Sequence, residues 1–211
     1  DIRTNPKRNL LDKIEDLLNR TKINEKINKN DIVAIKIHFG EYGNTAYLRP
    51  VFLRRIVERI KNLGGKPFLT DTNTLYTGSR SDAVSHLTTA IRNGFDYACV
   101  ECPIIIADGI RGATGIKIPI DGDILKEVSI AKEIVEADAM IVVTHFKAHE
   151  LSGFGGSLKN IGMGCATREG KLVQHSNVAP IIKSNNCKGC RTCLDYCPAG
   201  AIAIKDKKAS I

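Results

Sequence analysis

The feature that most constrains the fold of this chain is a repeated alternation between short β-branched runs and amphipathic helical segments. Residues 32–37 are apolar except for one lysine, as expected for a buried strand. From Pro50 onward, apolar side chains recur at helical spacing until a Gly-Gly pair stops the pattern. A second strand is expected at 67–70 and a second helix at about 81–92. Strands and helices in this order predict an α/β fold with a mostly parallel sheet flanked by helices.

The remaining elements are less regular. Leucine and isoleucine spacing predicts an additional helix over residues 9–20. Residues 104–107 and 116–120 are expected to be strands around glycine-bearing turns, in an antiparallel excursion from the sheet. A helix over about 130–136 is then expected to lead into residues 139–143, which have the most strand-like pattern of all.

Composition sets the class of protein. The chain has 211 residues, 43% of them hydrophobic and 26% charged, which excludes a disordered or collagen-like protein. No apolar run is long enough for a transmembrane helix, and the first residues are polar, so we expect a cytoplasmic protein without a membrane partner. We divide the chain into an α/β domain (1–180) and a short cysteine-rich segment (181–211).

The cysteine-rich segment carries the most specific motif. It reads Cys187-Lys-Gly-Cys190-Arg-Thr-Cys193-Leu-Asp-Tyr-Cys197-Pro198, which is C-x2-C-x2-C-x3-C-P, the ligand run of bacterial ferredoxins. Thiolates two residues apart on a tight loop suit three corners of a cubane, so we expect a [4Fe-4S] cluster. Zinc is the alternative, since C-x2-C pairs also bind tetrahedral zinc.

The fourth cysteine raises the question of a second cluster. In two-cluster ferredoxins the last cysteine of each run ligates the other cluster, so Cys197 would serve a second one. The residues after Cys197 contain no cysteine, but 201–204 and 209–211 have the pattern of a ferredoxin hairpin. We therefore expect a partial ferredoxin-type module, with the second cysteine run beyond the end of this sequence.

Polar side chains follow three of the predicted strands. His38 follows the first strand, Asp71 the second, and His145 and His149 the strand at 139–143. Because ligands bind beyond the carboxyl ends of parallel strands, these residues are expected to line one pocket and to be its catalytic groups.

The role of the two later histidines stays open. If the chain at 145–149 is helical, both imidazoles face one side, as in paired-histidine metal sites. With His38, Asp71 or Glu41 they would then hold a Zn or Fe ion. Otherwise they are hydrogen-bonding or acid–base groups, since an imidazole titrates near neutral pH.

A glycine-rich stretch at 153–164 is the third candidate for ligand binding. Gly155 and Gly156 let backbone N–H groups converge on an anion, and Lys159 supplies a positive charge. The alternative is tight packing against the histidine segment. The stretch matches neither a P-loop nor a dinucleotide-binding fingerprint.

Three separated motifs resemble the iron–sulfur proteins grouped as domain of unknown function 362. The first is Ile35-Lys-Ile-His-Phe-Gly-Glu41 with Gly43-Asn-Thr45 after it, the second is Thr70-Asp-Thr-Asn-Thr74, and the third spans 145–164. The resemblance implies an α/β domain that often carries a two-cluster ferredoxin module. It implies no particular reaction.

These observations predict an iron–sulfur redox protein and possible oxidoreductase. Its [4Fe-4S] module would exchange electrons with a redox partner protein or with an anionic small-molecule substrate in the strand-end pocket. One alternative is a non-catalytic electron carrier or a cluster-bearing, partner-binding protein. A nucleic-acid binder, suggested by the net charge of +8, is disfavoured because the chain has few aromatic residues for base stacking.

Overall fold

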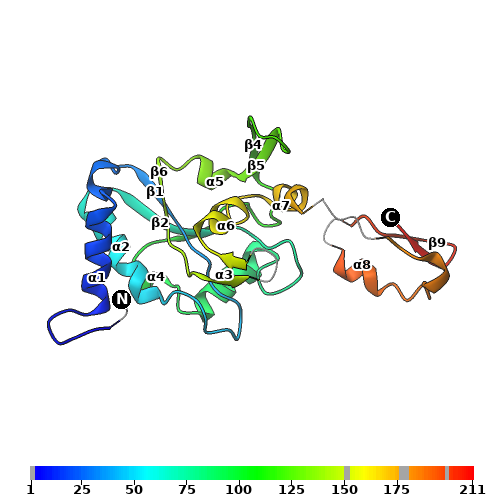
Figure 1. Cartoon of the computed structure of the whole chain (residues 1–211), viewed down its shortest axis with the longest axis horizontal. Helices are drawn as coiled ribbons and strands as arrows, with labels where there is room; N and C mark the ends of the chain where they lie inside the picture. The colour runs from blue at the N-terminus through cyan, green and yellow to red at the C-terminus, as the bar shows by residue number, and fades with distance from the viewer. Residues whose placement is uncertain (1–2, 150–152, 176–180, 198–199) are drawn as a thin grey trace.

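The computed structural model describes residues 3–149, 153–175, 181–197 and 200–211. Its centre is a four-stranded sheet in which all neighbouring strands are parallel (Figure 1). The strands are β1 (Ile32–Lys36), β2 (Lys66–Asp71), β3 (Ile104–Ile106) and β6 (Ala139–Val142). The predicted α/β class with a parallel sheet is confirmed.

The strand order of this sheet is β3-β2-β1-β6. The chain therefore builds outward from β1 through β2 to β3, and then returns to pair β6 with the other side of β1. Ile35 of β1 lies opposite Leu69 of β2 and Ile141 of β6. A reversal of strand order next to a central strand opens a crevice at the carboxyl ends of the strands.

Helices cover the sheet as the apolar spacing predicted. Helix α1 (Leu10–Arg20) is capped at its N-terminus by Asn9, which forms a capping box with Asp12. Helix α2 (Pro50–Asn62) has its proline in the first turn. Helix α2 contacts β2, α1 and α4 (Tyr97–Val100), and its Leu53, Val57 and Ile60 are fully buried. Helix α3 (Ala83–Arg92) follows an N-terminal cap at Asp82.

The middle of the chain differs from the prediction in two places. Residues 104–106 are a parallel edge strand of the main sheet, so only β4 (Gly115–Pro119) belongs to an antiparallel excursion. Its partner is β5 (Glu127–Ala131), and the helix expected over 130–136 is reduced to α5 (Lys132–Val135). Ile130 pairs with Ile116 across this hairpin, and the cross-strand contact outweighs its helical spacing.

The histidine segment is extended, which contradicts the helix considered for residues 145–149. β7 (Lys147–His149) pairs antiparallel with β8 (Gly153–Gly155), and β8 forms the first part of the glycine-rich stretch. That stretch continues as α6 (Ser157–Gly162), and α7 (Arg168–Gln174) follows. With residues 147–149 extended, His145 and His149 are not one helical turn apart on a shared face.

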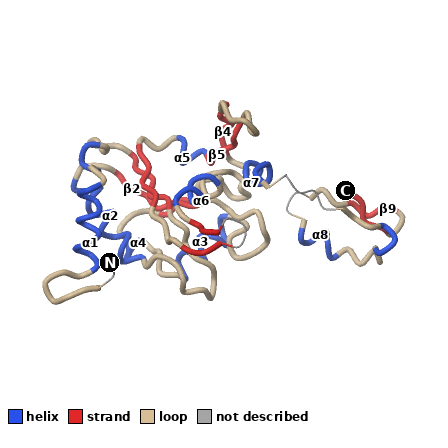
Figure 2. The backbone as a smooth tube through the Cα atoms, viewed as in Figure 1, coloured by secondary structure: helices blue, strands red, loops and turns tan. Residues whose placement is uncertain are grey.

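The cysteine-rich segment lies apart from the α/β body in Figures 1 and 2. It contains η2 (Ser184–Asn186), α8 (Thr192–Tyr196) and a hairpin of β9 (Ala203–Lys205) and β10 (Lys208–Ser210). Asp206 and Lys207 turn this hairpin with positive φ angles of 47° and 60°, the geometry of a two-residue turn between antiparallel strands. The hairpin predicted after Cys197 is therefore present.

In the described part of the chain, no helix is long and apolar enough to cross a membrane.

Candidate functional site

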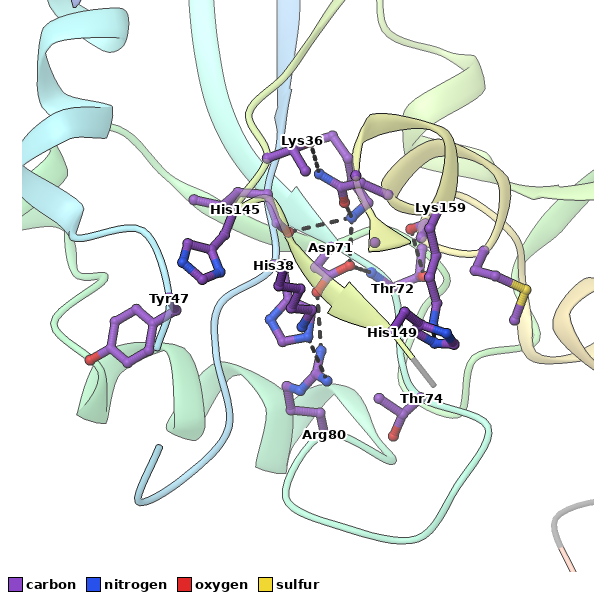
Figure 3. A pocket seen from close by; sticks show the side chains of 18 of the residues that line it. Lys36, His38, Tyr47, Asp71, Thr72, Thr74, Arg80, His145, His149 and Lys159 are labelled. Atoms are coloured by element: carbon purple, nitrogen blue, oxygen red, sulfur yellow. Dashed lines mark hydrogen bonds and ion pairs between the residues drawn. The ribbon is translucent and has the colours of Figure 1, made fainter. Parts of the chain in front are cut away.

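A cavity of about 410 Å³ lies at the carboxyl edge of the parallel sheet, beside the reversal of strand order. Its walls come from the ends of β1 and β2, the loop after β6, the β7–β8 hairpin, and helices α6 and α7. The structure brings all seven pocket residues expected from the sequence to this cavity, and Figure 3 labels five of them. The seven are His38, Asp71, His145, His149, Gly155, Gly156 and Lys159.

A buried ion pair joins the two central strands beneath the cavity. Lys36, the last residue of β1, is 1% exposed, and its Nζ lies 2.8 Å from Oδ1 of Asp71, the last residue of β2. The same Nζ donates to Oδ1 of Asn160 on α6 at 2.7 Å (Figure 3). This lysine therefore ties both strands to the helix formed by the glycine-rich stretch.

Arg80 is the second cation held by Asp71. Its Nη1 lies 3.3 Å from Asp71 Oδ2, and its Nε donates to Glu41 Oε1 at 3.0 Å. Tyr76 Oη donates to the same Glu41 oxygen at 2.6 Å. The guanidinium is 3% exposed, so it is positioned on several sides within the wall of the cavity.

Asp71 is the anionic centre of this network. Burial by itself would raise its pKa, but Lys36, His86 and Arg80 outweigh burial and hold the pKa well below its usual range. His86 Nε2 lies 3.6 Å from Asp71 Oδ2, and the His86 ring is fully buried. Asp71 is therefore a carboxylate whose oxygens are already directed toward cations, which fits a positioning role better than proton transfer.

His38 is held as a neutral imidazole. Burial lowers its pKa to about 4, and the charge of Arg80 contributes to the shift. Its Nδ1 accepts from the backbone N–H of Gly40 at 2.9 Å, and its Nε2 lies 3.1 Å from Nη2 of Arg80. The neutral ring can accept from only one of these two donors, and protonation would direct an N–H at the second donor as well.

The glycine-rich stretch packs closely against Lys36 and also contributes a lysine to the cavity. Gly164 is required by packing, since a Cβ there would lie 2.7 Å from Lys36 Nζ and 2.1 Å from Asn160 O. Lys159 contacts His149 Nε2 and lines the cavity. Burial and the nearby Lys147 lower the pKa of Lys159. Close packing at Gly164 thus accompanies a lysine presented to the cavity.

The cavity has a marked excess of positive charge. The described residues that line it include five cationic side chains and a single carboxylate, Asp71. Four of the chain's five histidines also line it, and the fifth is His86 behind Asp71. The five cationic side chains are Lys36, Arg80, Lys147, Lys159 and Lys171.

The sequence interpretation did not identify Lys36, Arg80, His86 or Lys171 as site residues. A usable indication existed for Lys36, because a lysine inside an otherwise apolar buried run requires a counter-charge. Arg80 and His86 lie in a polar loop and on a helix, where such residues are ordinarily solvent-exposed. Only their contacts with Asp71 distinguish them.

The charge of the cavity is opposite to what a Zn or Fe ion at the histidines would require. His38 faces Arg80, Glu41 accepts from Arg80, and Asp71 is shared by Lys36 and Arg80, so three of the five expected ligands already have cationic partners. Among the residues with described placement, no three His, Cys, Asp or Glu side chains are grouped as a metal site, and this includes the four C-terminal cysteines.

The donor chemistry of the cysteine-rich segment nevertheless suits thiolate ligands. All four cysteines are free thiols. Cys187 Sγ accepts from Ala209 N at 3.2 Å and Cys197 Sγ accepts from Ala201 N at 3.3 Å. Backbone hydrogen bonds lower the pKa of Cys187, and contacts with Thr192 lower the pKa of Cys190. These residues fit an iron–sulfur cluster in donor type, although their sulfur atoms are not gathered around one point.

Comparison with known proteins assigns the family. Residues 33–197 match the family described as domain of unknown function (DUF362), which covers most of the chain, so the protein belongs to it. The matched region reaches from β1, through every wall of the cavity, to Cys197. Neither the curated proteins nor the solved structures contain a match.

Removing the carboxylate of Asp71 should destabilise the protein. Asp71→Asn leaves Lys36 buried without a counter-charge and removes one of the two carboxylates that contact Arg80, so we expect the free energy of unfolding to fall by about 3–5 kcal/mol in urea denaturation. Glu136→Gln breaks an exposed pair with Lys132 and should cost no more than about 0.5 kcal/mol. Equal losses in the two variants would contradict the role assigned to Asp71.

The pKa of His38 predicts a pH dependence of stability. Because its folded pKa is about 4 and its ordinary value is 6.5, the unfolded chain binds this proton first as the pH falls. The His38 contribution should therefore be present above pH 6.5 and be lost between pH 6.5 and about 4. His38→Gln should remove that part of the dependence when unfolding is measured across this range. Parallel curves for wild type and variant would show that His38 does not have this pKa.

Proposed function

We propose that this protein is an iron–sulfur redox protein whose α/β domain binds an anionic small molecule in the strand-end cavity. The observation that supports anion binding is that the described lining residues include five lysine or arginine side chains and a single carboxylate. Asp71 offsets part of the charge of Lys36 and Arg80, but Lys147 and Lys159 have no described carboxylate within ion-pair distance. An anion would satisfy these charges.

The cavity suits a small carboxylate or phosphate in size and position. Its volume is within the range of small-molecule sites, and it lies where open parallel sheets bind their ligands. Lys159 and Lys147 are exposed enough to meet a ligand arriving from solvent. Lys36 and Arg80 are fixed by Asp71, so little conformational entropy is lost when an anion binds near them.

Groups for proton transfer adjoin the anion-binding charges. His38 is neutral at physiological pH and therefore has one nitrogen lone pair. Burial raises the pKa of Tyr76 to about 12, so its hydroxyl stays protonated. In this proposal the lone pair of His38 stays with its protein donor, and His145 and His149 contribute hydrogen bonds and proton transfer from the β7 side of the cavity.

The redox half of the proposal rests on the cysteine run and its hydrogen bonds. Cys187, Cys190 and Cys193 have the spacing of ferredoxin ligands, and Gly189 adopts a φ of +70°, with a Cβ position only 2.3 Å from Lys207 O. Only glycine is accommodated there, which lets the ligand loop pass closely over the β9–β10 hairpin. A [4Fe-4S] cluster, when bound, supplies one-electron transfer to a partner or to the α/β domain.

Anion binding is the direct test of the cavity. Titration calorimetry with pyruvate, oxalate and inorganic phosphate should show binding of at least one anion at one site per chain, weakened by added salt. Lys159→Met should lower the affinity about tenfold or more, because a charge-assisted hydrogen bond is worth about 1.5–3 kcal/mol.

A matched control uses an exposed lysine away from the cavity. Lys132 on α5 pairs with Glu136 and does not line the cavity, so Lys132→Met should leave the affinity unchanged. Binding of none of the three anions would refute the proposed ligand class. Equal weakening by both substitutions would indicate a general charge effect instead of a site.

Cluster binding is tested separately. Anaerobic reconstitution with ferrous iron and sulfide should give a chain that contains iron and sulfide and shows an electron paramagnetic resonance signal on reduction. Cys190→Ser should abolish iron uptake, since a serine hydroxyl is a poor replacement for a thiolate ligand.

Cys102→Ser provides the comparison for this experiment. Cys102 is buried in the α/β core, and burial raises the pKa of its thiol to about 11, so it should not ligate iron. Stoichiometric zinc without sulfide would contradict the iron–sulfur assignment and favour a structural zinc site.

A further inference from the structure

Lys171 is a buried cavity lysine whose surroundings differ from those of the other buried lysine. It lies on α7, is 6% exposed and lines the cavity. Its Nζ donates to Thr72 Oγ1 and to Ala166 O, both at 2.5 Å. Neither acceptor is charged, and no carboxylate in the described part of the chain lies within 4 Å of this nitrogen. Lys36, in contrast, is paired with Asp71.

The two hydrogen bonds of Lys171 go to neutral acceptors and use both N–H groups of a neutral amine, whereas an ammonium group would direct a third N–H at the cavity. A neutral amine has two N–H groups and one lone pair, whereas an ammonium group has three N–H groups. Thr72 Oγ1 already donates its own proton to Gly164 O at 2.8 Å, so it accepts from Lys171. With Ala166 O as the second acceptor, both N–H groups are used and the lone pair remains free.

Burial acts in the same direction as this geometry. It lowers the pKa of Lys171 to about 8 from an ordinary value of 10.5, although Asp108 and Asp71 oppose the shift. Lys36 lowers the value further and Cys165 raises it. A reduction of this size increases the neutral fraction of the amine at pH 7 by about two orders of magnitude.

We propose that Lys171 is a nucleophilic amine that forms a Schiff base with the carbonyl carbon of a 2-oxo acid bound in the cavity. The proposal rests on the proposed anion binding, because the cationic walls would hold the carboxylate of this substrate. An amine that is desolvated among neutral acceptors is the usual form of a Schiff-base lysine. The second buried lysine is excluded by its ion pair with Asp71.

The step is balanced without any further reactant. The lone pair of Lys171 Nζ forms a bond to the carbonyl carbon, and the carbonyl oxygen takes up two protons and leaves as water. Both N–H protons of the amine are lost in forming the imine. His145, which lines the same cavity, carries an imidazole that can transfer one of these protons.

Reductive trapping tests this assignment. The protein is incubated with pyruvate or glyoxylate and sodium cyanoborohydride, which transfers hydride to the imine carbon and leaves a stable secondary amine. Peptide mass mapping should locate the adduct on Lys171, with at least about tenfold less on Lys36 and on the exposed Lys132. Trapping should increase as the pH rises through about 8. Lys171→Met should lose the adduct, whereas Lys132→Arg should retain it.

The outcomes separate this inference from the proposed anion site. Calorimetric binding of pyruvate or glyoxylate without an adduct on Lys171 would overturn the nucleophile assignment and leave the anion-binding function intact. Adducts spread evenly over exposed lysines would also overturn it. Because mapping is done on the wild-type protein, with Lys36 as the internal comparison, the test does not depend on the stability of the Lys171→Met variant.

Discussion

The buried carboxylate of Asp71 is the interaction on which the rest of the site depends. It stands at the end of β2, compensates Lys36 at the end of β1 and Arg80 in the following loop, and lies 3.6 Å from Nε2 of His86. Without a counter-charge, neither cation would remain buried, because the free energy needed to desolvate an isolated charge exceeds the stabilisation gained from packing its side chain. The glycine-rich stretch is coupled to the same centre, since Asn160 accepts from Lys36 and Gly164 leaves room for it.

This centre also explains why the open part of the cavity is lined by cationic side chains. Asp71 directs its oxygens toward protein cations, so it contributes little negative potential to the open part of the cavity. Lys147 on the β7–β8 hairpin and Lys159 on α6 then determine the sign of the field at the open part of the cavity. The positions of the cations follow from the strand order, which places β6 beside β1 and brings the later segments over the crevice.

The two buried lysines of the cavity, Lys36 and Lys171, have different hydrogen-bond partners, and we assign them different roles for this reason. Lys36 has a carboxylate and an amide oxygen as partners and acts as a fixed cation. Lys171 has a hydroxyl and a carbonyl as partners, and this surrounding favours a neutral amine. In our proposal the cationic walls of the cavity hold the anionic group of a ligand, and Lys171, the buried lysine without a carboxylate partner, attacks a carbonyl carbon of the same ligand.

The sequence by itself determined the α/β class, because strand and helix periodicities are local properties of consecutive residues. It also determined which side chains follow the strand ends, so His38, Asp71, His145, His149 and Lys159 could be expected at one cavity. The helix considered for 145–149 was wrong because the partner strand β8 decides that segment. Only the tertiary structure decided which cations share Asp71 and which lysine stays unpaired. These contacts join residues up to 124 positions apart, and the energy of a buried charge depends on the groups that surround it in space.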